Sequence, residues 1–167
     1  MNQSVLILNH KQICHICKRI AWQIYEENID SFVIYIAGVD SRGMFLAEKI
    51  AKELQEIGQL EIKLFNIVID RNNFEPSFYS DFPLNDLKNE ALIVVDDVLN
   101  SGKTLISSFL PLIQRQVSKI SIAVLASRSH RLYPVEANFV GVSMATTIQE
   151  HLLFDNTDEN NLKLTLN

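Results

Sequence analysis

The hydrophobic pattern of this chain switches repeatedly between the period of a helix and that of a buried strand. Apolar residues follow helical spacing over about 9–28, where Asn9 and Gln12 resemble a capping box at the helix start. Residues 32–37 form a short apolar run that predicts a buried strand, and residues 43–57 return to helical spacing. The first third of the chain therefore predicts a helix, a strand and a second helix.

The pattern continues in the same way afterwards, apart from one polar segment. Residues 60–69 alternate between apolar and polar positions, as a strand does. Residues 70–87 are polar, carry prolines and aromatics and show no period, so they predict a long loop of the kind that usually has a function. A helix is expected over 103–114, where Pro111 should kink it or mark a tighter turn. The remaining predicted strands cover 92–95, 119–126, 137–142, 151–154 and 162–166.

Strands that alternate with helices imply a mostly parallel central sheet with helices on both faces, which is an α/β fold. The length of 167 residues suits one domain with its own hydrophobic core. No linker, repeat or low-complexity segment divides the chain. We therefore expect a single α/β domain over residues 1–167.

Composition narrows the classes of function. The formal net charge of −5 argues against a generally basic nucleic-acid-binding protein. The N-terminus does not resemble a signal peptide, and the apolar runs are too short to span a membrane, so we expect a cytoplasmic protein without a membrane partner. Cys14 and Cys17 form a Cys-x-x-Cys pair within helical spacing. Cys17 is expected to be a core thiol rather than a metal ligand or redox group, because no second pair accompanies it.

Residues 91–105 carry the strongest chemical signal in the sequence. The apolar run Leu92–Val95 ends in two adjacent carboxylates, Asp96 and Asp97. An unpaired ionised carboxylate is costly to bury, so we expect both acids at the exposed carboxyl end of this strand. Ligands of open α/β sheets bind at that edge.

The loop that follows these acids has the features of an anion site. Gly102 allows a tight turn, and the hydroxyls of Ser101 and Thr104 flank the N-terminus of the next predicted helix, which offers free N–H donors. A simple capping turn is one alternative. A Walker A remnant is excluded by spacing, because that motif needs a glycine where this chain has Asp97. Acids beside an anion site suit a sugar that carries phosphate groups.

A second loop, Gly38–Gly43, also follows a strand and opens a helix. It holds Ser41 and Arg42, and an arginine suits bidentate contact with phosphate oxygens. The alternative is an ordinary strand-to-helix turn with a surface arginine. The loop is therefore a second candidate anion site.

The stretch from Val94 to Thr104 resembles the phosphoribosyl-pyrophosphate-binding motif of type I phosphoribosyltransferases. The wider chain is similar to one branch, the pyrimidine operon attenuator/uracil phosphoribosyltransferase family. The similarity covers most of the chain, at residues 5–8, 37–43, 71, 94–104, 123–125, 129–131, 134 and 139–141. It implies the type I fold, with a short hood, a flexible loop and a homodimer or larger assembly of dimers, for which His130, Arg131 and Tyr133 are placed to form the contact.

The resemblance also implies an activity and its residues. The expected reaction uses phosphoribosyl pyrophosphate and Mg²⁺ to convert a free base, uracil by preference, into its nucleoside monophosphate. Asp96 and Asp97 would bind the ribose hydroxyls directly or through Mg²⁺, and Arg71 would be the catalytic arginine of the flexible loop. The 5-phosphate would bind to Leu99, Asn100, Ser101, Gly102, Lys103 and Thr104. Pyrophosphate would bind to Val39, Asp40, Ser41, Arg42 and Gly43.

The acceptor base is indicated by fewer residues. Purine-specific relatives often carry an acid at the position of Asn100, where it can exchange a proton with the purine ring. Asn100 cannot do so, which argues against a purine as the acceptor base. The base pocket is expected near 127–131 and 139–147, with Arg128, Phe139 and Val140 as candidates, and an ordinary polar edge turn is the alternative.

Several positions depart from the family pattern. Asn72 and Asn73 replace residues that are commonly acidic, and the 70–87 loop is shorter. Trp22 stands where a related protein has a histidine, and residues 141–152 contain no lysine or arginine, so we expect no specific RNA binding. The altered loop leaves a second hypothesis open, a non-catalytic regulator of the pyrimidine pathway that binds phosphoribosyl pyrophosphate or a nucleotide.

Overall fold

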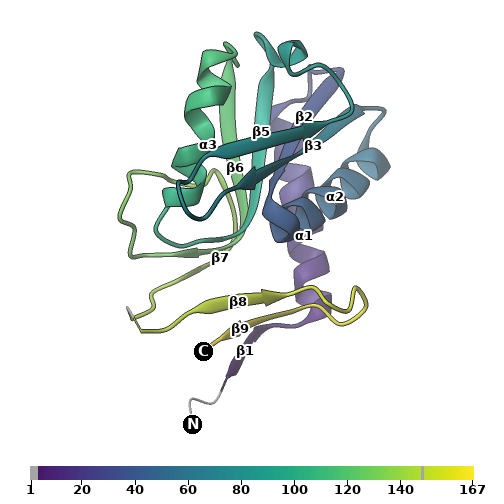
Figure 1. Cartoon of the computed structure of the whole chain (residues 1–167). Helices are drawn as coiled ribbons and strands as arrows, with labels where there is room; N and C mark the ends of the chain where they lie inside the picture. The colour runs from purple at the N-terminus through teal and green to yellow at the C-terminus, as the bar shows by residue number, and fades with distance from the viewer. Residues whose placement is uncertain (1–3, 148) are drawn as a thin grey trace.

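The computed structural model describes residues 4–147 and 149–167, so the first three residues and Ile148 lie outside the described part. Within the described residues, the fold contains two sheets and three α-helices, arranged as in Figure 1. The six-stranded sheet has the order β4-β3-β2-β5-β6-β7, and the three-stranded sheet has the order β1-β9-β8. The strands are β1 (Val5–Leu8), β2 (Val33–Val39), β3 (Glu61–Ile69), β4 (Pro76–Ser80), β5 (Ala91–Leu99), β6 (Lys119–Arg128), β7 (Phe139–Met144), β8 (Leu152–Asp155) and β9 (Lys163–Leu166). The helices are α1 (His10–Glu27), α2 (Asp40–Ile57), α3 (Lys103–Gln114) and the 3-10 helix η1 (Leu84–Leu87).

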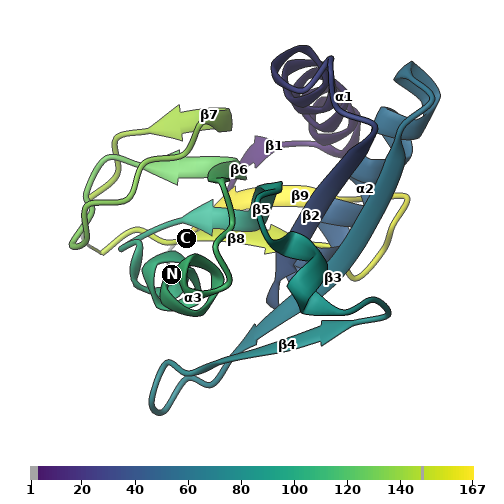
Figure 2. The same cartoon turned by 90° about the horizontal axis from the view of Figure 1, so that it is seen from above.

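The large sheet is parallel except at one edge, as the sequence predicts. Strands β3, β2, β5, β6 and β7 pair in parallel, and β4 pairs antiparallel with β3. Helices α1 and α2 cover one face and α3 covers the other (Figure 2). The predicted α/β class, with a central, mostly parallel sheet between helices, is therefore confirmed.

The helix faces explain how the two sides of the sheet become buried. The stripe of α1 includes Ile13, Cys17 and Ile24, and these side chains pack with α2 against the sheet. Burial raises the pKa of the Cys17 thiol to about 12, which agrees with the expectation of a core thiol. No helix within the described residues has both the length and the apolar character needed to cross a membrane.

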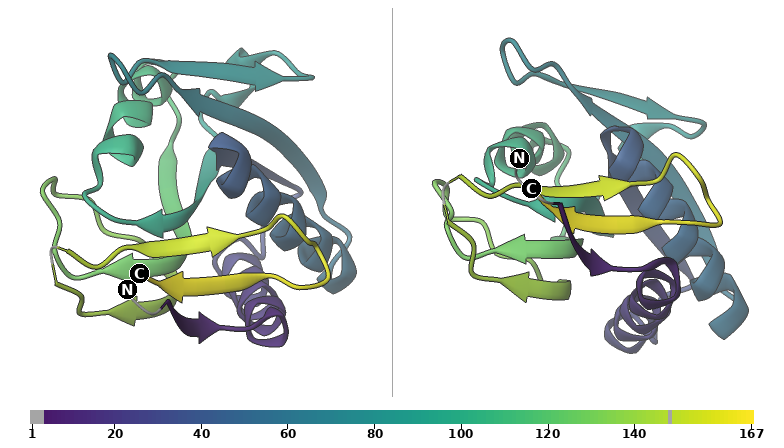
Figure 3. Two further views of the ribbon diagram at one scale, coloured as in Figure 1. Left: turned by 60° about the horizontal axis from the view of Figure 1, so that its bottom comes forward. Right: turned by 90° about the horizontal axis from the view of Figure 1, so that it is seen from below.

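The small sheet forms the hood and brings the two ends of the chain together (Figure 3). Val5 on β1 pairs with Leu166 on β9, and β9 pairs antiparallel with β8. Strand β8 contacts β5, so the hood lies beside the strand that carries the two acids (Figure 1). The hood therefore forms a wall beside β5, the strand that carries Asp96 and Asp97.

The prediction of an unstructured loop over 70–87 is wrong. Strands β3 and β4 form a hairpin in which Ile69 pairs with Pro76, and η1 follows the hairpin. Aromatic contacts hold the segment, since the Phe65 ring meets the rings of Phe78 and Phe82 at 6.5 and 5.9 Å between centroids. The parts of this segment without helix or strand are the hairpin tip, residues 70–75, and the short link at 81–83.

Other boundaries shift by a few residues. Helix α2 begins at Asp40 rather than at Gly43, and β6 continues to Arg128. Helix α3 has the predicted limits with Pro111 inside it. Strand β5 runs on to Leu99, so Asp96 and Asp97 lie within the strand and not after it. This last difference changes the environment of the acids.

Candidate active site

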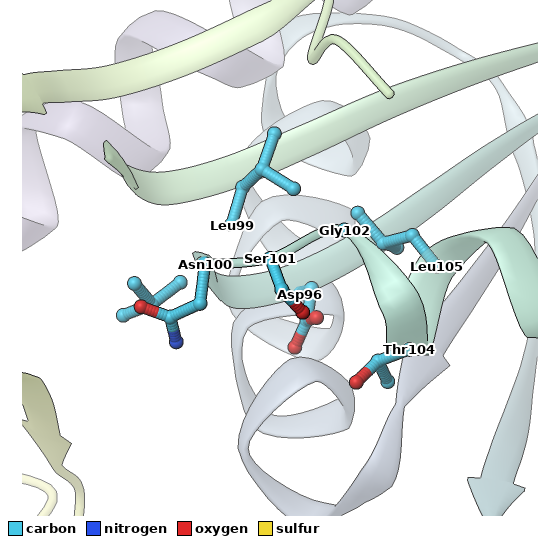
Figure 4. A pocket seen from close by; sticks show the side chains of 8 residues that line it. Asp96, Leu99, Asn100, Ser101, Gly102, Thr104 and Leu105 are labelled. Atoms are coloured by element: carbon cyan, nitrogen blue, oxygen red, sulfur yellow. The ribbon is translucent and has the colours of Figure 1, made fainter. Parts of the chain in front are cut away.

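The loop between β5 and α3 has the geometry of an anion site. Gly102 has a φ of 83°, in the left-handed region that favours glycine. The carbonyl of Ser101 accepts hydrogen bonds from the N–H groups of Leu132 and Tyr133 at 3.1 and 3.0 Å, which anchors the loop to a distant segment. Gly102 offers no side-chain cap to α3, and Oγ of Ser101 accepts from the N–H of Lys103 at 3.3 Å. The first turn of α3, which offers further N–H donors, borders a small hollow (Figure 4). The hollow is lined by Asp96, Val98, Leu99, Asn100, Ser101, Gly102, Thr104 and Leu105.

The two adjacent acids have different environments, because consecutive side chains on a strand point to opposite faces. Asp96 lines the hollow together with Thr104, and only 9% of the residue is exposed (Figure 4). Asp97 lies on the side of α2, where its Oδ2 is 3.9 Å from Nη1 of Arg42. The expectation that both acids are exposed is therefore wrong for Asp96.

Burial makes the protonation of the pair unequal. Desolvation, followed by the negative charge of Asp97, raises the pKa of Asp96 well above its usual value. The N–H of Asp97 donates to Oδ1 of Asp96 at 2.9 Å, which joins the two residues but does not reverse the shift. Asp96 therefore takes up a proton at a higher pH than an exposed carboxyl group does, which weakens its repulsion of an anion in the hollow.

The second anion loop forms the end of β2 and the first turn of α2. Val39 is the last residue of β2, Ser41 and Arg42 are exposed, and Gly43 is buried against β5. A Cβ atom on Gly43 would lie 2.5 Å from the carbonyl oxygen of Val95, so only glycine allows this approach. The close contact places the two loops side by side.

Asp40 and Arg71 connect the second loop to the tip of the β3–β4 hairpin. The guanidinium of Arg71 forms an ion pair with Oδ2 of Asp40, and its Nη1 donates to Oγ1 of Thr104 at 3.1 Å. The other carboxylate oxygen of Asp40 accepts from the N–H of Ile69 at 2.9 Å. Asp40 itself has a φ of 52°, a strained conformation for a residue with a side chain. Arg71 therefore bridges the two anion loops.

Lys103 also contacts the hairpin tip. Its Nζ lies 3.7 Å from the centre of the Phe74 ring, in a cation–π contact that holds the ammonium group near the first turn of α3. The sequence did not indicate Phe74, because nothing local connects an aromatic on the hairpin with a lysine on α3. The structure thus brings Lys103, Thr104, Asp40 and Arg71 to one place.

Arg128 lies at the carboxyl end of β6, where it faces both the first anion loop and the segment after β7. Its Nε donates to Oγ1 of Thr146 at 2.7 Å, its Nη2 to the carbonyl of Thr147 at 2.7 Å, and its Nη1 to Oδ1 of Asn100 at 3.4 Å. A larger hollow opens here, and it is lined by Asn100, Ser101, Arg128, Ser129, His130, Arg131, Leu132 and His151. The hood supplies His151 through the position of β8, which no local pattern in the sequence reveals.

Phe139 and Val140 are not part of this hollow, contrary to the expectation for the base pocket. They pair with Ala123 and Val124 at the amino end of β7, whereas Arg128 pairs with Met144 at the other end. Phe139 is a buried core residue. The sequence analysis expected Arg128, Phe139 and Val140 in one base pocket. The pairing register of β6 and β7 instead places Arg128 at the opposite end of these strands from Phe139 and Val140.

The comparisons with known proteins agree with this geometry. The family profile described as phosphoribosyl transferase domain matches residues 6–154. The bifunctional protein PyrR of Bacillus subtilis (strain 168) is 30% identical over 175 residues, which cover 97% of this chain and 96% of the relative. PyrR of Bacillus cereus (strain B4264) is 31% identical over 168 residues, covering 93% of this chain and 92% of the relative.

Solved structures with low sequence identity share the fold. The hypoxanthine phosphoribosyltransferase of Trypanosoma cruzi has a TM-score of 0.79 at 11% identity and covers 96% of this chain and 95% of its own. A hypoxanthine-guanine phosphoribosyltransferase of Bacillus anthracis has a TM-score of 0.67 at 18% identity, with 84% and 82% covered. With the profile match and the two PyrR relatives, these observations show that the chain belongs to the phosphoribosyltransferase family and is a homologue of the PyrR proteins.

Proposed function

We propose that this protein transfers ribose 5-phosphate from phosphoribosyl pyrophosphate to a free base, with uracil preferred, and releases pyrophosphate. The observation that carries the proposal is the pair of helix N-termini, of α3 and α2, which Arg71 bridges, with Asp97 beside Arg42 of α2. Such a site suits a donor with a phosphate at each end of a sugar. We further propose that residues 1–167 act as one domain.

In the proposed reaction, positive charge develops on the sugar while one bond at C1′ breaks and another forms. The bond between C1′ and the pyrophosphate oxygen breaks, the bond between C1′ and a ring nitrogen of the base forms, and the proton of that nitrogen leaves to solvent. The sugar becomes cation-like at the transition state, as in glycoside hydrolysis, so the carboxylate of Asp97 stabilises it. Residues 99–104 would hold the 5-phosphate.

The pyrophosphate would bind at the second anion loop, Gly38–Gly43, although the side chain of Asp40 in this loop opposes that binding. Ser41, Arg42 and the N–H groups of the α2 first turn are donors for it, and Arg71 would turn from Asp40 towards it. The side chain of Asp40 is an anion and repels pyrophosphate, so only its backbone N–H would serve in the way the family resemblance implies. The ion pair with Arg71 therefore competes with the ligand.

The residues present fit Mg²⁺ as a partner of the donor. Mg²⁺ prefers oxygen ligands and retains several waters, and the carboxylate of Asp97 offers such an oxygen at the site. Within the described residues no group of three or more histidine, cysteine or acidic side chains could hold a metal by itself, so substrate oxygens and water would complete the shell. When bound, Mg²⁺ would neutralise the leaving pyrophosphate.

The preference for a pyrimidine rests on Asn100. Its Oδ1 accepts a hydrogen bond from Arg128, and an amide cannot exchange a proton with a purine ring. The related structures are named for hypoxanthine, so purines belong in the test. The test supplies the pure protein with phosphoribosyl pyrophosphate, Mg²⁺ and uracil, hypoxanthine, guanine or adenine in turn. We expect pyrophosphate release with uracil above all, and release with none of them would refute the proposed enzyme.

A second candidate function is a regulator that binds phosphoribosyl pyrophosphate or a nucleotide without turnover. The observation in its favour is the hairpin tip, where Asn72 and Asn73 replace commonly acidic residues and Arg71 is paired with Asp40. Calorimetric binding of phosphoribosyl pyrophosphate without pyrophosphate release on any base would establish it. We also propose a cytoplasmic homodimer, for which light scattering on a sizing column is the test.

A further inference from the structure

A buried positive charge without a carboxylate partner faces the larger hollow. Arg128 is only 8% exposed, and its guanidinium donates to three neutral oxygens, those of Thr146, Thr147 and Asn100. Across residues 4–147 and 149–167, no carboxylate oxygen lies within 4.0 Å of its nitrogens, whereas Arg42 and Arg71 each have one. Buried guanidinium groups are normally paired, so this arrangement indicates that the counter-charge arrives with a ligand.

The other charged groups around the hollow do not supply that counter-charge. Arg131 adds a second guanidinium, held by the Ser127 hydroxyl at 2.9 Å, and His130 and His151 form the wall on opposite sides. The carboxylate of Glu150 instead accepts from the N–H and hydroxyl of Thr147 at 2.6 and 3.0 Å. These bonds, with a smaller effect from Arg128, hold the pKa of Glu150 below its usual range. Among the residues that line the hollow, Arg128 and Arg131 carry a charge and none is acidic.

The proposed reaction gives this charge a use. The acceptor ring nitrogen must lose its proton, and in a pyrimidine-dione this N–H is acidic because the resulting negative charge spreads by conjugation onto both ring oxygens. A planar guanidinium matches two such acceptors on a heterocycle. In cytosine an amino group replaces one of these carbonyls, so its ring N–H is less acidic.

We propose that this hollow binds the acceptor base as an anion and that Arg128 is its specificity-determining residue. The proposal rests on the proposed function for the place of the hollow in the reaction. It selects acidic heterocycles, whether the charge lies on the ring, as in a deprotonated pyrimidine-dione, or on an attached carboxylate, as in orotate. Arg128 lowers the cost of deprotonating the base by stabilising the product of that step.

The ring charge can be tested without turnover. The ¹⁹F resonance of 5-fluorouracil reports whether the ring is ionised, so a pH titration of the base bound to the full chain gives its midpoint in the hollow. We expect a midpoint lower than in free solution by about one pH unit, equivalent to about a tenfold preference for the anion. Arg128→Gln should abolish the shift, and Arg128→Lys should retain part of it. An unshifted midpoint together with equal affinities for uracil and cytosine would overturn the proposal.

Calorimetry with uracil, cytosine and orotate distinguishes the two sources of charge. Orotate that binds about tenfold more tightly than uracil, with an unshifted 5-fluorouracil midpoint, would place the anion on the carboxylate and support the shared chemistry. Arg131→Gln, at the exposed rim, is the matched control and should change these affinities less than Arg128→Gln. Circular dichroism verifies that each variant is folded. Because none of these readouts requires turnover, their failure is distinguishable from failure of the proposed enzyme.

Discussion

Asp96 and Asp97 show how neighbouring residues of the same type acquire different roles. Their side chains leave β5 on opposite faces, so Asp96 lies in the phosphate hollow and Asp97 beside Arg42. Desolvation raises the pKa of the first, and the second remains partly accessible. We therefore propose that Asp97 is the acid that would bind the sugar and that Asp96 would shape the phosphate site.

Replacing Asp97 by asparagine should slow transfer by about 10- to 1,000-fold, because it removes the negative charge that stabilises a cation-like sugar. Steady-state rates of pyrophosphate release with uracil measure the effect. The control is Asp30→Asn, because Asp30 lies on an exposed turn between α1 and β2. This variant should leave the rate unchanged. A variant at Asp97 that retained the full rate would contradict the role assigned to this acid.

Replacing Asp96 by asparagine should stabilise the fold at neutral pH. A folded-state pKa raised above the ordinary value of 3.8 means that Asp96 imposes no penalty below that pH and destabilises the fold increasingly as the pH rises towards the raised pKa. The isosteric amide removes this cost, so we expect a gain of about 1–3 kcal/mol in the free energy of unfolding at neutral pH. Urea denaturation of both proteins at several pH values measures the difference. If the gain in the free energy of unfolding were as large in acid as at neutral pH, the raised pKa of Asp96 would not be its cause.

Replacing Asp40 by asparagine should release Arg71 and remove an anion from the pyrophosphate loop. Because the Arg71 side chain is 60% exposed, solvent screens the pair, and we expect pyrophosphate to bind only about two- to fivefold more tightly. Calorimetry measures the affinity, and hydrogen exchange of residues 70–75 should become faster. The control is Asp70→Asn, since that carboxylate accepts from the N–H of Asn72 and not from Arg71. Weaker pyrophosphate binding in Asp40→Asn would show that Asp40 assists the ligand.

At the scale of the elements, the site depends on how closely α2 approaches β5. Local patterns predicted α1, α2 and α3 within a few residues, because their apolar stripes and their caps or stop signals are adjacent in sequence. The β3–β4 hairpin was missed, because its strand is held by pairing with β3 and by contacts to Phe65, which lies outside the segment. Elements stabilised by distant partners carry little local signal.

Replacing Gly43 by alanine should separate the two anion loops. The added methyl group would lie 2.5 Å from the carbonyl oxygen of Val95, so the start of α2 must move away from β5. We expect a loss of about 1–3 kcal/mol in the free energy of unfolding and weaker pyrophosphate binding. Thermal unfolding and calorimetry measure the two effects. In the control Gly58→Ala the methyl group meets the Tyr25 side chain, which can rotate, so pyrophosphate binding should be unchanged.

At the scale of the whole molecule, net charge and hydrogen bonding affect the prospect of RNA binding. The PyrR relatives are named bifunctional, which makes this second activity worth testing. The net charge is −5, and the guanidinium of Arg19 on α1 is engaged by the carbonyls of Val140 and Gly141 at 3.0 and 2.8 Å. That bond ties α1 to the edge strand β7. It leaves one fewer free cation on α1.

We expect no specific binding to a pyrimidine leader transcript, because phosphate contacts by lysine and arginine provide most of the affinity for RNA. Filter binding across a salt series is the measurement, with a scrambled RNA of equal length as the control. Salt-sensitive binding in the nanomolar range that favoured the leader over the scrambled RNA would disprove this expectation.

The sequence by itself determined the α/β class and the donor motif. Helical and strand periods, the apolar run before Asp96 and the glycine and hydroxyl residues after it are all properties of contiguous segments. Tertiary structure decided which acid is buried, that Arg71 pairs with Asp40, and that Arg128 rather than Phe139 faces the hollow next to the hood. These outcomes depend on strand order and register, which bring together residues far apart in the chain and set how much water reaches each charge.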